Sequence, residues 1–235
     1  MKEVSDTTVL KKIAGTAAAD LVKNGMTVGI GTGSTVAFFI EELGRRVREG
    51  LSIYGVPTSY QSRLICYQQG IPVRDPAMID GIDIAIDGAD EIDHDLNAIK
   101  GGGAAHTIEK IIAAMADEFV LIADSSKLVD RLAVSIPVPV EVIPAALSLV
   151  VRRTREAGAN PKLRIAVKKD GPVITDNGNF VVDLYFSDAP DMHKLDYTLK
   201  SIPGVVETGL FIGMAHKALI AGKEGLNMLT AGRLS

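Results

Sequence analysis

Cysteine and long apolar runs are both scarce in this sequence, and each scarcity limits what the protein can be. Cys66 is the one cysteine among 235 residues. A single thiol cannot form an intramolecular disulfide, and it cannot supply a structural zinc site. The longest stretch without a charged side chain, residues 24–40, is interrupted by glycine, serine and threonine and is too short to span a bilayer. The sequence therefore excludes a disulfide scaffold and predicts no transmembrane helix.

An excess of positive charge is absent as well. Lys and Arg number 25 against 29 Asp and Glu, a formal net charge of -4. Such a chain has no global basic field, so we expect no nucleic-acid partner, and any anionic ligand must be held by local groups. The first residues, Met-Lys-Glu-Val-Ser-Asp, lack the apolar segment of a signal peptide. We therefore expect a cytoplasmic enzyme or binding protein with no membrane partner.

What the chain does contain is apolar material with regular periodicity. Hydrophobic residues make up 47% of it, which is ample for a packed core and excludes intrinsic disorder. In the first half, short apolar runs alternate with segments of helical spacing. The expected strands cover residues 26–30, 51–56, 72–74, 82–86 and 119–123, and the expected helices cover 7–24, 34–49, 59–69 and 105–116. This alternation predicts an α/β fold with a doubly wound, mostly parallel sheet of the Rossmann-like type.

The pattern changes after Lys127, where three prolines mark the entry to a smaller unit. The elements expected there are strands over 138–142 and 163–167, a hairpin over 173–186 that turns at Asn177-Gly178, helices over 145–156 and 192–201, and a strand from Val205. Their order predicts a second, smaller ferredoxin-like α+β domain. We assign residues 131–206 to this domain. Residues 1–130 and 207–235 are assigned to the Rossmann-like catalytic domain, to which the apolar segment 211–220 returns as a last strand.

A glycine-rich turn, Gly31-Thr32-Gly33-Ser34-Thr35, follows the first expected strand and leads into a helix. Backbone N–H groups at a helix N-terminus, with hydroxyl groups beside them, bind phosphate, so the turn favours a phosphate site. The alternative is a turn that needs glycine for backbone geometry alone. The dinucleotide fingerprint fails because Ser34 stands where its third glycine belongs, and the Walker A loop fails because no Gly-Lys-Ser/Thr follows.

Carboxylates gather after the strand expected over residues 82–86, beginning with Asp87-Gly88-Ala89-Asp90. Such a run is typical of a solvated loop or of a metal site. A calcium loop that starts at Asp93 is excluded, because alanine occupies positions 98 and 104, where glycine and a bidentate glutamate are needed. A magnesium site on Asp87 and Asp90 stays open as an alternative. Otherwise we expect no metal.

A lysine and a glutamate lie on either side of a triple glycine. Lys100-Gly101-Gly102-Gly103 precedes the helix expected over 105–116, which carries Glu109 near its start. A carboxylate partly shielded from water has its pKa raised toward neutrality, where it can remove a proton from carbon. Glu109 is therefore either a general base or an ordinary glutamate that stabilises the helix dipole. Residues 31–35, 87–90 and 124–127 each follow an expected strand, and because the carboxyl ends of parallel strands share one edge, we expect these three segments to meet. Lys100 could join them from its loop.

The other reactive side chains receive no chemical role. The four histidines, His94, His106, His193 and His216, lack the spacing of a catalytic triad or a metal site and are expected on the surface or in packing positions. Cys66 is expected to be a small core residue.

Five ordered motifs give the sequence a family resemblance over essentially its whole length. They are Gly29-Ile-Gly-Thr-Gly-Ser-Thr, Ile86-Asp-Gly-Ala-Asp-Glu, Lys100-Gly-Gly-Gly-Ala-Ala, Ile122-Ala-Asp-Ser-Ser-Lys and Val140-Glu-Val-Ile-Pro. Together they closely resemble the type A ribose-5-phosphate isomerases. The resemblance implies the reversible isomerisation of D-ribose 5-phosphate to D-ribulose 5-phosphate through an enediolate, in the non-oxidative pentose phosphate pathway, with no cofactor. It also suggests a homodimer or homotetramer.

The resemblance further implies roles for individual residues. Glu109 would be the general base that moves a proton between C1 and C2, and Lys100 would stabilise the oxyanion. Asp87 and Asp90 would orient the hydroxyls and assist ring opening and proton transfer between oxygens. The residues expected to bind substrate are Thr32, Gly33, Ser34, Thr35, Asp87, Gly88, Ala89, Asp90, Lys100, Gly101, Gly102, Gly103 and Lys127. His106 stands where the family usually has a larger apolar residue, and it could perturb the pKa of Glu109.

Two alternatives stay open. An amino-sugar-phosphate deaminase or isomerase shares a Thr-Gly-Ser-Thr type of phosphate loop, but it should lack the Asp-Gly-Ala-Asp-Glu and Lys-Gly-Gly-Gly motifs. A module that senses a sugar phosphate without catalysis could keep the pocket. The presence of both Glu109 and Lys100 argues against it, and fold analogy alone would not choose among these functions.

Overall fold

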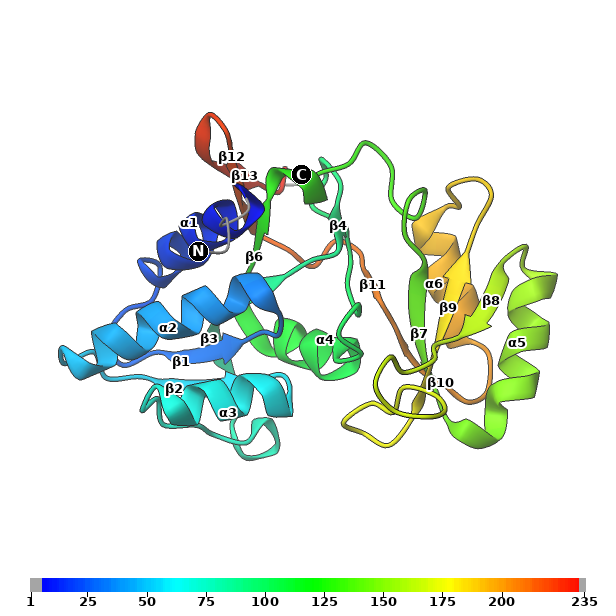
Figure 1. The fold of residues 1–235 in the computed structure, drawn as a ribbon, viewed down its shortest axis with the longest axis horizontal. Coiled ribbons are helices and arrows are strands. Elements are labelled where there is room, and N and C mark those ends of the chain that lie inside the picture. The colour runs from blue at the N-terminus through cyan, green and yellow to red at the C-terminus, as the bar shows by residue number, and fades with distance from the viewer. Residues whose placement is uncertain (1–5, 233–235) are drawn as a thin grey trace.

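The computed structural model describes residues 6–232, which form three β-sheets with helices around them (Figure 1). Residues 1–5 and 233–235 lie outside the described part of the chain, and so does most of the amino-terminal segment from which the absence of a signal peptide was predicted. Within residues 6–232, no helix combines the length and the apolar character needed to cross a membrane.

A six-stranded sheet forms the larger part of the molecule. Its strands are β1 (Thr27–Ile30), β2 (Tyr54–Pro57), β3 (Ile82–Gly88), β6 (Ala116–Asp124), β12 (Lys217–Gly222) and β13 (Gly225–Thr230), in the order β13-β12-β6-β3-β1-β2. Every pair is parallel except β12 with β13. β2 and β3 lie on opposite sides of β1, so the strand order reverses at β1. This is the doubly wound sheet that the sequence predicts, and such a reversal leaves a crevice at the carboxyl ends of the strands.

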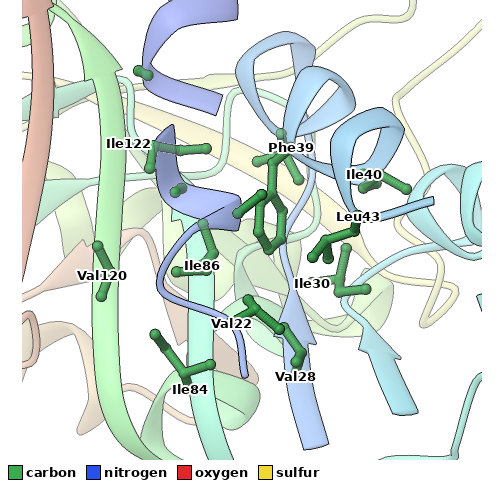
Figure 2. Close-up of a cluster of buried hydrophobic side chains, with 14 of the residues drawn as sticks. Val22, Val28, Ile30, Phe39, Ile40, Leu43, Ile84, Ile86, Val120 and Ile122 are labelled. Carbon is green, nitrogen blue, oxygen red and sulfur yellow. The ribbon is translucent and has the colours of Figure 1, made fainter. Parts of the chain in front are cut away.

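Helices cover both faces of this sheet because side chains alternate along its strands. Ile84 and Ile86 of β3 face one cluster, to which α1 (Asp6–Ala19) and α2 (Ser34–Arg48) contribute. Figure 2 shows Phe39, Ile40 and Leu43 of α2 above Ile30, Ile84 and Ile86 of the strands. On the opposite face, Ala85 joins a second cluster with Ile112 of α4 (His106–Met115). Helices α2 and α4 therefore pack on opposite faces of the six-stranded sheet, over the same strand β3.

A four-stranded antiparallel sheet forms the smaller part, on the right in Figure 1. Its strands are β7 (Val138–Val142), β8 (Asn160–Leu163), β9 (Phe180–Tyr185) and β10 (Val205–Thr208), in the order β10-β7-β9-β8. Helix α5 (Leu147–Glu156) follows β7, and α6 (Met192–Lys200) precedes β10. This β-α-β-β-α-β succession is the ferredoxin-like arrangement expected from the sequence.

Several elements differ from the sequence expectation. Residues 163–167 were expected as a strand, but β8 ends at Leu163 and only Ile165 continues with an isolated bridge. Residues 72–74 likewise contribute a single bridge, at Val73. The segment 211–220 splits into β11 (Leu210–Phe211) and the start of β12, and β13 follows as an unexpected antiparallel edge strand. The turn at Asn177-Gly178 is confirmed, since the N–H of Thr175 donates to the carbonyl of Asn179 across it at 2.9 Å.

A third, three-stranded sheet was not predicted. It consists of β4 (Glu91–Ile92), β5 (Ala98–Ile99) and β11, in the order β11-β5-β4. Two-residue strands are too short to show a periodic pattern in sequence. The pairing nevertheless matters, because β5 leads directly into the triple-glycine loop. The remaining elements are α3 (Tyr60–Gln68) and the short 3-10 helices η1 (Pro76–Met78), η2 (Ser125–Lys127) and η3 (Pro144–Ala146).

Candidate active site

A cleft of about 630 Å³ lies at the carboxyl ends of β1, β3 and β6. The glycine-rich turn after β1, the loop after β3, the triple glycine before α4 and the η2 turn after β6 all line it. The three segments that follow strands were predicted to meet, and the triple glycine joins them from its loop. The predicted site residues in the lining are Thr32, Gly33, Ser34, Thr35, Gly88, Ala89, Asp90, Lys100, Gly101, Gly102, Gly103, Glu109 and Lys127.

The turn after β1 requires glycine at two positions. A Cβ atom on Gly31 would lie 2.0 Å from Oδ1 of Asp87. Gly33 has a φ of 121°, a backbone conformation that residues with a side chain rarely adopt. Gly33 caps α2 without a side chain, so the N–H groups of the first helical turn can donate to an anion in the cleft. The Thr32 hydroxyl donates to the Ser59 hydroxyl at 2.6 Å and ties the turn to the start of α3. The glycines therefore serve backbone geometry, and the same geometry is suited to binding phosphate.

A buried lysine contacts two buried carboxylates at the centre of the site. The Nζ atom of Lys100 lies 2.9 Å from Oδ2 of Asp87 and 3.2 Å from Oε2 of Glu109. It also donates to the carbonyl oxygen of Gly88 at 2.5 Å. The exposed fractions of Lys100, Asp87 and Glu109 are 2%, 3% and 5%. Since β3 carries Asp87 and α4 carries Glu109, the packing of the helix on the sheet creates this group of charges.

These three charges shift one another's pKa values. Burial, and next the negative charge of Asp87, raise the pKa of Glu109 to about 8 against the opposing effect of Lys100. Burial also raises the pKa of Asp87. Burial by itself lowers the pKa of Lys100, but the two carboxylates outweigh it and leave that pKa raised. Lys100 therefore stays a cation while Glu109 titrates close to neutrality, where a general base is most effective.

Asp90 lies at the cleft surface and fixes the triple-glycine loop. Its Oδ2 atom accepts a hydrogen bond from the N–H of Gly102 at 2.7 Å. A Cβ atom on Gly102 would lie 2.8 Å from the other carboxylate oxygen, so a side chain there would push Asp90 away. Arg164 holds the loop from the smaller sheet, because it donates to the carbonyl of Gly101 at 2.7 Å and pairs with Asp183.

Asp87, in contrast, lies beneath the cleft and is not in its lining. Its Oδ1 atom accepts hydrogen bonds from the N–H groups of Thr32, at 3.1 Å, and Gly88, at 2.7 Å, and its other oxygen contacts Lys100. It therefore acts on the cleft indirectly, because it pairs with Lys100 and its charge raises the pKa of Glu109. A divalent cation at Asp87 would be repelled by the ammonium group 2.9 Å away. Over residues 6–232, no group of three or more His, Cys, Asp or Glu side chains is arranged to hold a metal ion.

Some residues that line the cleft were not predicted from the sequence. Lys11 reaches the cleft from α1, and Gln61 reaches it from α3. Residues 173–176 form another part of the wall, and there Asp176 accepts a hydrogen bond from the N–H of Tyr60 at 2.8 Å. A lysine on an amphipathic helix looks like an ordinary solvated residue, so Lys11 carries no local signal. Its neighbours in the cleft come from far along the chain.

The remaining reactive side chains lie where the sequence predicted, with His94, His193 and His216 exposed at the surface and His106 and Cys66 packed in the interior. His106 is fully buried, and burial lowers its pKa to about 4, so it is neutral at physiological pH. The main causes of the shifted pKa of Glu109 are burial, Asp87, Lys100 and Asp90. Cys66 is buried in the core cluster beside α2, which confirms the prediction of a core residue.

Fold and site together define a class, an α/β enzyme with a buried lysine–carboxylate group suited to acid–base chemistry in a cleft at the switch point of its sheet. Comparison with known proteins narrows the class. Residues 54–225 match the family described as ribose 5-phosphate isomerase A (phosphoriboisomerase A). The ribose-5-phosphate isomerase A of Methanosarcina acetivorans is 56% identical over 219 residues, which cover 92% of this chain and 91% of the relative. That of Methanothermobacter thermautotrophicus is 52% identical over 221 residues, or 94% and 97% of the two chains.

Solved structures agree with the sequence relatives. A D-ribose-5-phosphate isomerase in complex with phospho-erythronic acid has a TM-score of 0.93 at 44% identity and covers 96% of this chain and 99% of that one. Ribose 5-phosphate isomerase A from Methanocaldococcus jannaschii has a TM-score of 0.91 at 44% identity, over 94% and 98%. The chain belongs to the ribose-5-phosphate isomerase A family, as its motifs suggested. It is an isomerase.

Proposed function

We propose that this chain interconverts D-ribose 5-phosphate and D-ribulose 5-phosphate. The observation that carries the proposal is the Lys100–Glu109 pair, a buried carboxylate with a pKa of about 8 beside a fixed ammonium group in the cleft. Aldose–ketose isomerisation needs both a base that removes a proton from carbon and a positive group that stabilises the resulting enediolate. A glycine-rich helix N-terminus in the same cleft can hold the phosphate.

Glu109 acts as the general base in this proposal. With the open-chain aldose in the cleft, it removes the proton from C2, and the electrons move onto the carbonyl oxygen to form the enediolate. The proton of the C2 hydroxyl moves to O1, and the same carboxyl group returns the abstracted proton to C1, which yields the ketose. A base with a pKa near the working pH can both take up and release this proton, and a positioned base contributes roughly 100- to 10,000-fold.

Lys100 stabilises the oxyanion. Its ammonium group is held by Asp87 and Gly88, so its position is set before substrate arrives. A group that is already oriented needs no rearrangement when negative charge develops, and removing one such donor typically costs ~3 kcal/mol. Asp87 thus supports Lys100 and raises the pKa of Glu109 from beneath the cleft.

The cleft surface holds the rest of the substrate. Asp90, fixed by Gly102, orients hydroxyl groups and assists ring opening and proton transfer between oxygens. The phosphate lies at the start of α2, against the N–H groups and hydroxyls of residues 32–35, with Lys127 and Lys11 as the cations that line the cleft beside it. Neither dinucleotide nor metal chemistry is needed for this reaction.

Turnover of ribose 5-phosphate in the presence of a chelator tests the proposal. Purified protein should form ribulose 5-phosphate, and Glu109→Gln should lose nearly all turnover with little change in substrate binding. Glu118→Gln is the matched control, because Glu118 pairs with Lys217 outside the cleft, and it should keep full activity. Binding without turnover in the unmutated protein would point to a sensor of sugar phosphates. Neither binding nor turnover would contradict the phosphate site as well.

We also propose a domain division, an oligomeric state and a cellular location for this enzyme. Residues 1–130 with 207–235 act as the catalytic unit, and residues 131–206 act as the smaller unit that supplies part of the cleft wall. Exposed apolar side chains on the smaller unit, such as Ile165 and Val167, support assembly into a homodimer or homotetramer. A buried cysteine that forms no disulfide in the described chain suits the reducing cytoplasm.

A further inference from the structure

Glu141 is a buried carboxylate that the proposed reaction does not use. It lies on β7, its exposed fraction is 0%, and it does not line the cleft. Its Oε1 atom accepts hydrogen bonds from the side chains of Thr175, at 2.8 Å, Asn177, at 3.0 Å, and Asn179, at 2.8 Å. Its Oε2 atom accepts hydrogen bonds from the hydroxyl of Thr107 and from the side-chain amide of Asn177, at 3.3 Å. Four neutral donors thus converge on one carboxylate.

These donors come from two segments that both shape the active site. Thr107 belongs to the first turn of α4, two residues before Glu109. Thr175 lines the cleft, and the turn formed by residues 175–179 continues the wall that Asp176 attaches to α3. Glu141, on β7 of the four-stranded sheet, therefore links the helix that carries the base to the wall of the cleft.

The negative charge of Glu141 is needed to hold this arrangement. A carboxylate has about four acceptor sites, which matches the four donors. Burial alone would raise the pKa of Glu141, but the hydrogen bonds outweigh it and lower that pKa, so the group stays ionised. An amide in its place would offer one oxygen and would turn an N–H₂ group toward side chains that are themselves donating.

We propose that Glu141 is a positioning residue for the isomerisation, which it serves by fixing Thr107 and hence the first turn of α4 and Glu109. The turn over residues 175–179 acts as the rigid anchor on the other side of the carboxylate. A displacement of about 1 Å in a catalytic group can cost about 100-fold in rate. This inference rests on the proposed function, since it concerns the base of that reaction.

The test compares Thr107→Val with Thr107→Ser, which restores the hydroxyl donor. We expect Thr107→Val to lower kcat about tenfold with KM within about twofold, because the base is misplaced but the phosphate site is intact. Thr107→Ser should recover most of the loss. Thr154→Val is the matched control. Thr154 is also a buried threonine, but its hydroxyl donates only within α5, to the carbonyls of Val150 and Val151, so its loss should lower Tm and leave kcat unchanged.

Glu141→Gln completes a double-mutant cycle with Thr107→Val. We expect about a 10- to 100-fold loss of kcat for Glu141→Gln, measured well below its Tm, and no further loss when Thr107→Val is added, because both changes break the same link. Additive losses would overturn the proposed route through Thr107. If Glu141→Gln does not fold, equal kcat values for the valine and serine variants at position 107 would overturn the inference by themselves. An unmutated protein that does not isomerise ribose 5-phosphate would overturn the proposed function first, and this inference with it.

Discussion

The pH dependence of turnover gives the sharpest test of the base. Glu109 must be ionised to remove a proton, so kcat/KM should rise with pH through the pKa of this carboxyl group. That pKa is raised to about 8 by burial and by the neighbouring charge of Asp87. The sign is clear, because the deprotonated form is the active one and activity falls as pH drops below the pKa.

The magnitude follows from the same value. With a pKa of about 8, roughly one carboxyl group in eleven is ionised at pH 7 and roughly ten in eleven at pH 9, so kcat/KM should rise about tenfold across this interval. The Lys100 ammonium remains charged over the range because its own pKa is raised. A phosphate ester has its second pKa near 6, so the substrate's own titration lies below the measured interval.

A variant can move this midpoint in a known direction. Asp87→Asn removes a negative charge next to Glu109 and leaves Lys100 with Glu109 as its one carboxylate contact, so the midpoint should move below about 8 while kcat also falls. Asp83→Asn is the control on the same strand. Asp83 is exposed and its carboxylate accepts a hydrogen bond from the N–H of Thr27 at 2.7 Å, so its loss should leave the midpoint in place.

The assay is the initial rate of ribulose 5-phosphate formation at low substrate concentration between pH 7 and pH 10, in buffers of constant ionic strength. A flat profile in this range would refute the reasoning, since it would mean that Glu109 is fully ionised at pH 7 or is not the base. A midpoint near 8 that does not move in Asp87→Asn would show that the charge of Asp87 does not act on Glu109.

Three further predictions concern other parts of the molecule. Lys127→Ala should raise KM about 10- to 100-fold and change kcat much less, because a charged hydrogen bond to substrate contributes about 1.5–3 kcal/mol. Steady-state kinetics measures both constants, and a fall in kcat as large as the rise in KM would contradict a binding role. Gly31→Ala should abolish nearly all activity, because the added methyl group would meet Asp87, whose Oδ1 lies 2.0 Å from the new Cβ position; the same change at Gly81, which has open space around it, should leave the rate unaffected. Cys66 should resist iodoacetamide at pH 8 in the native protein and react in urea, since burial raises the pKa of its thiol to about 12; rapid labelling of the native state would contradict its burial.

The sequence predicted most of the larger sheet, because each element there is long enough to show its own pattern. The residues of α2, for example, carry the helical spacing that places Phe39 and Leu43 on the sheet. The sequence also predicted that the loops after β1, β3 and β6 meet. That prediction needed no long-range information, since parallel strands in one sheet present their carboxyl ends at the same edge.

The errors in the fold lie where the pattern is short or where pairing is not local. Strands β4, β5 and β11 have two residues each, and they exist because their partners lie beside them, not because of any local preference. The same holds for β8, whose bounds depend on pairing with β9. Lys11 has no local signal at all, because only the packing of α1 brings it to the cleft.

By itself, then, the sequence determined the order of elements, the glycine turn, the acidic loop and the Lys100–Glu109 pair as candidates, because these depend on residue type and spacing along the chain. Only the tertiary structure determined the distances, the burial and hence the pKa values of the charged groups in the site. The separation of 3.2 Å between Lys100 and Glu109, the place of Asp87 beneath them and the burial of all three depend on how α4 packs against β3. Glu109 has a pKa of about 8 because water is excluded from it and a second carboxylate is near, and contacts between distant segments create both conditions.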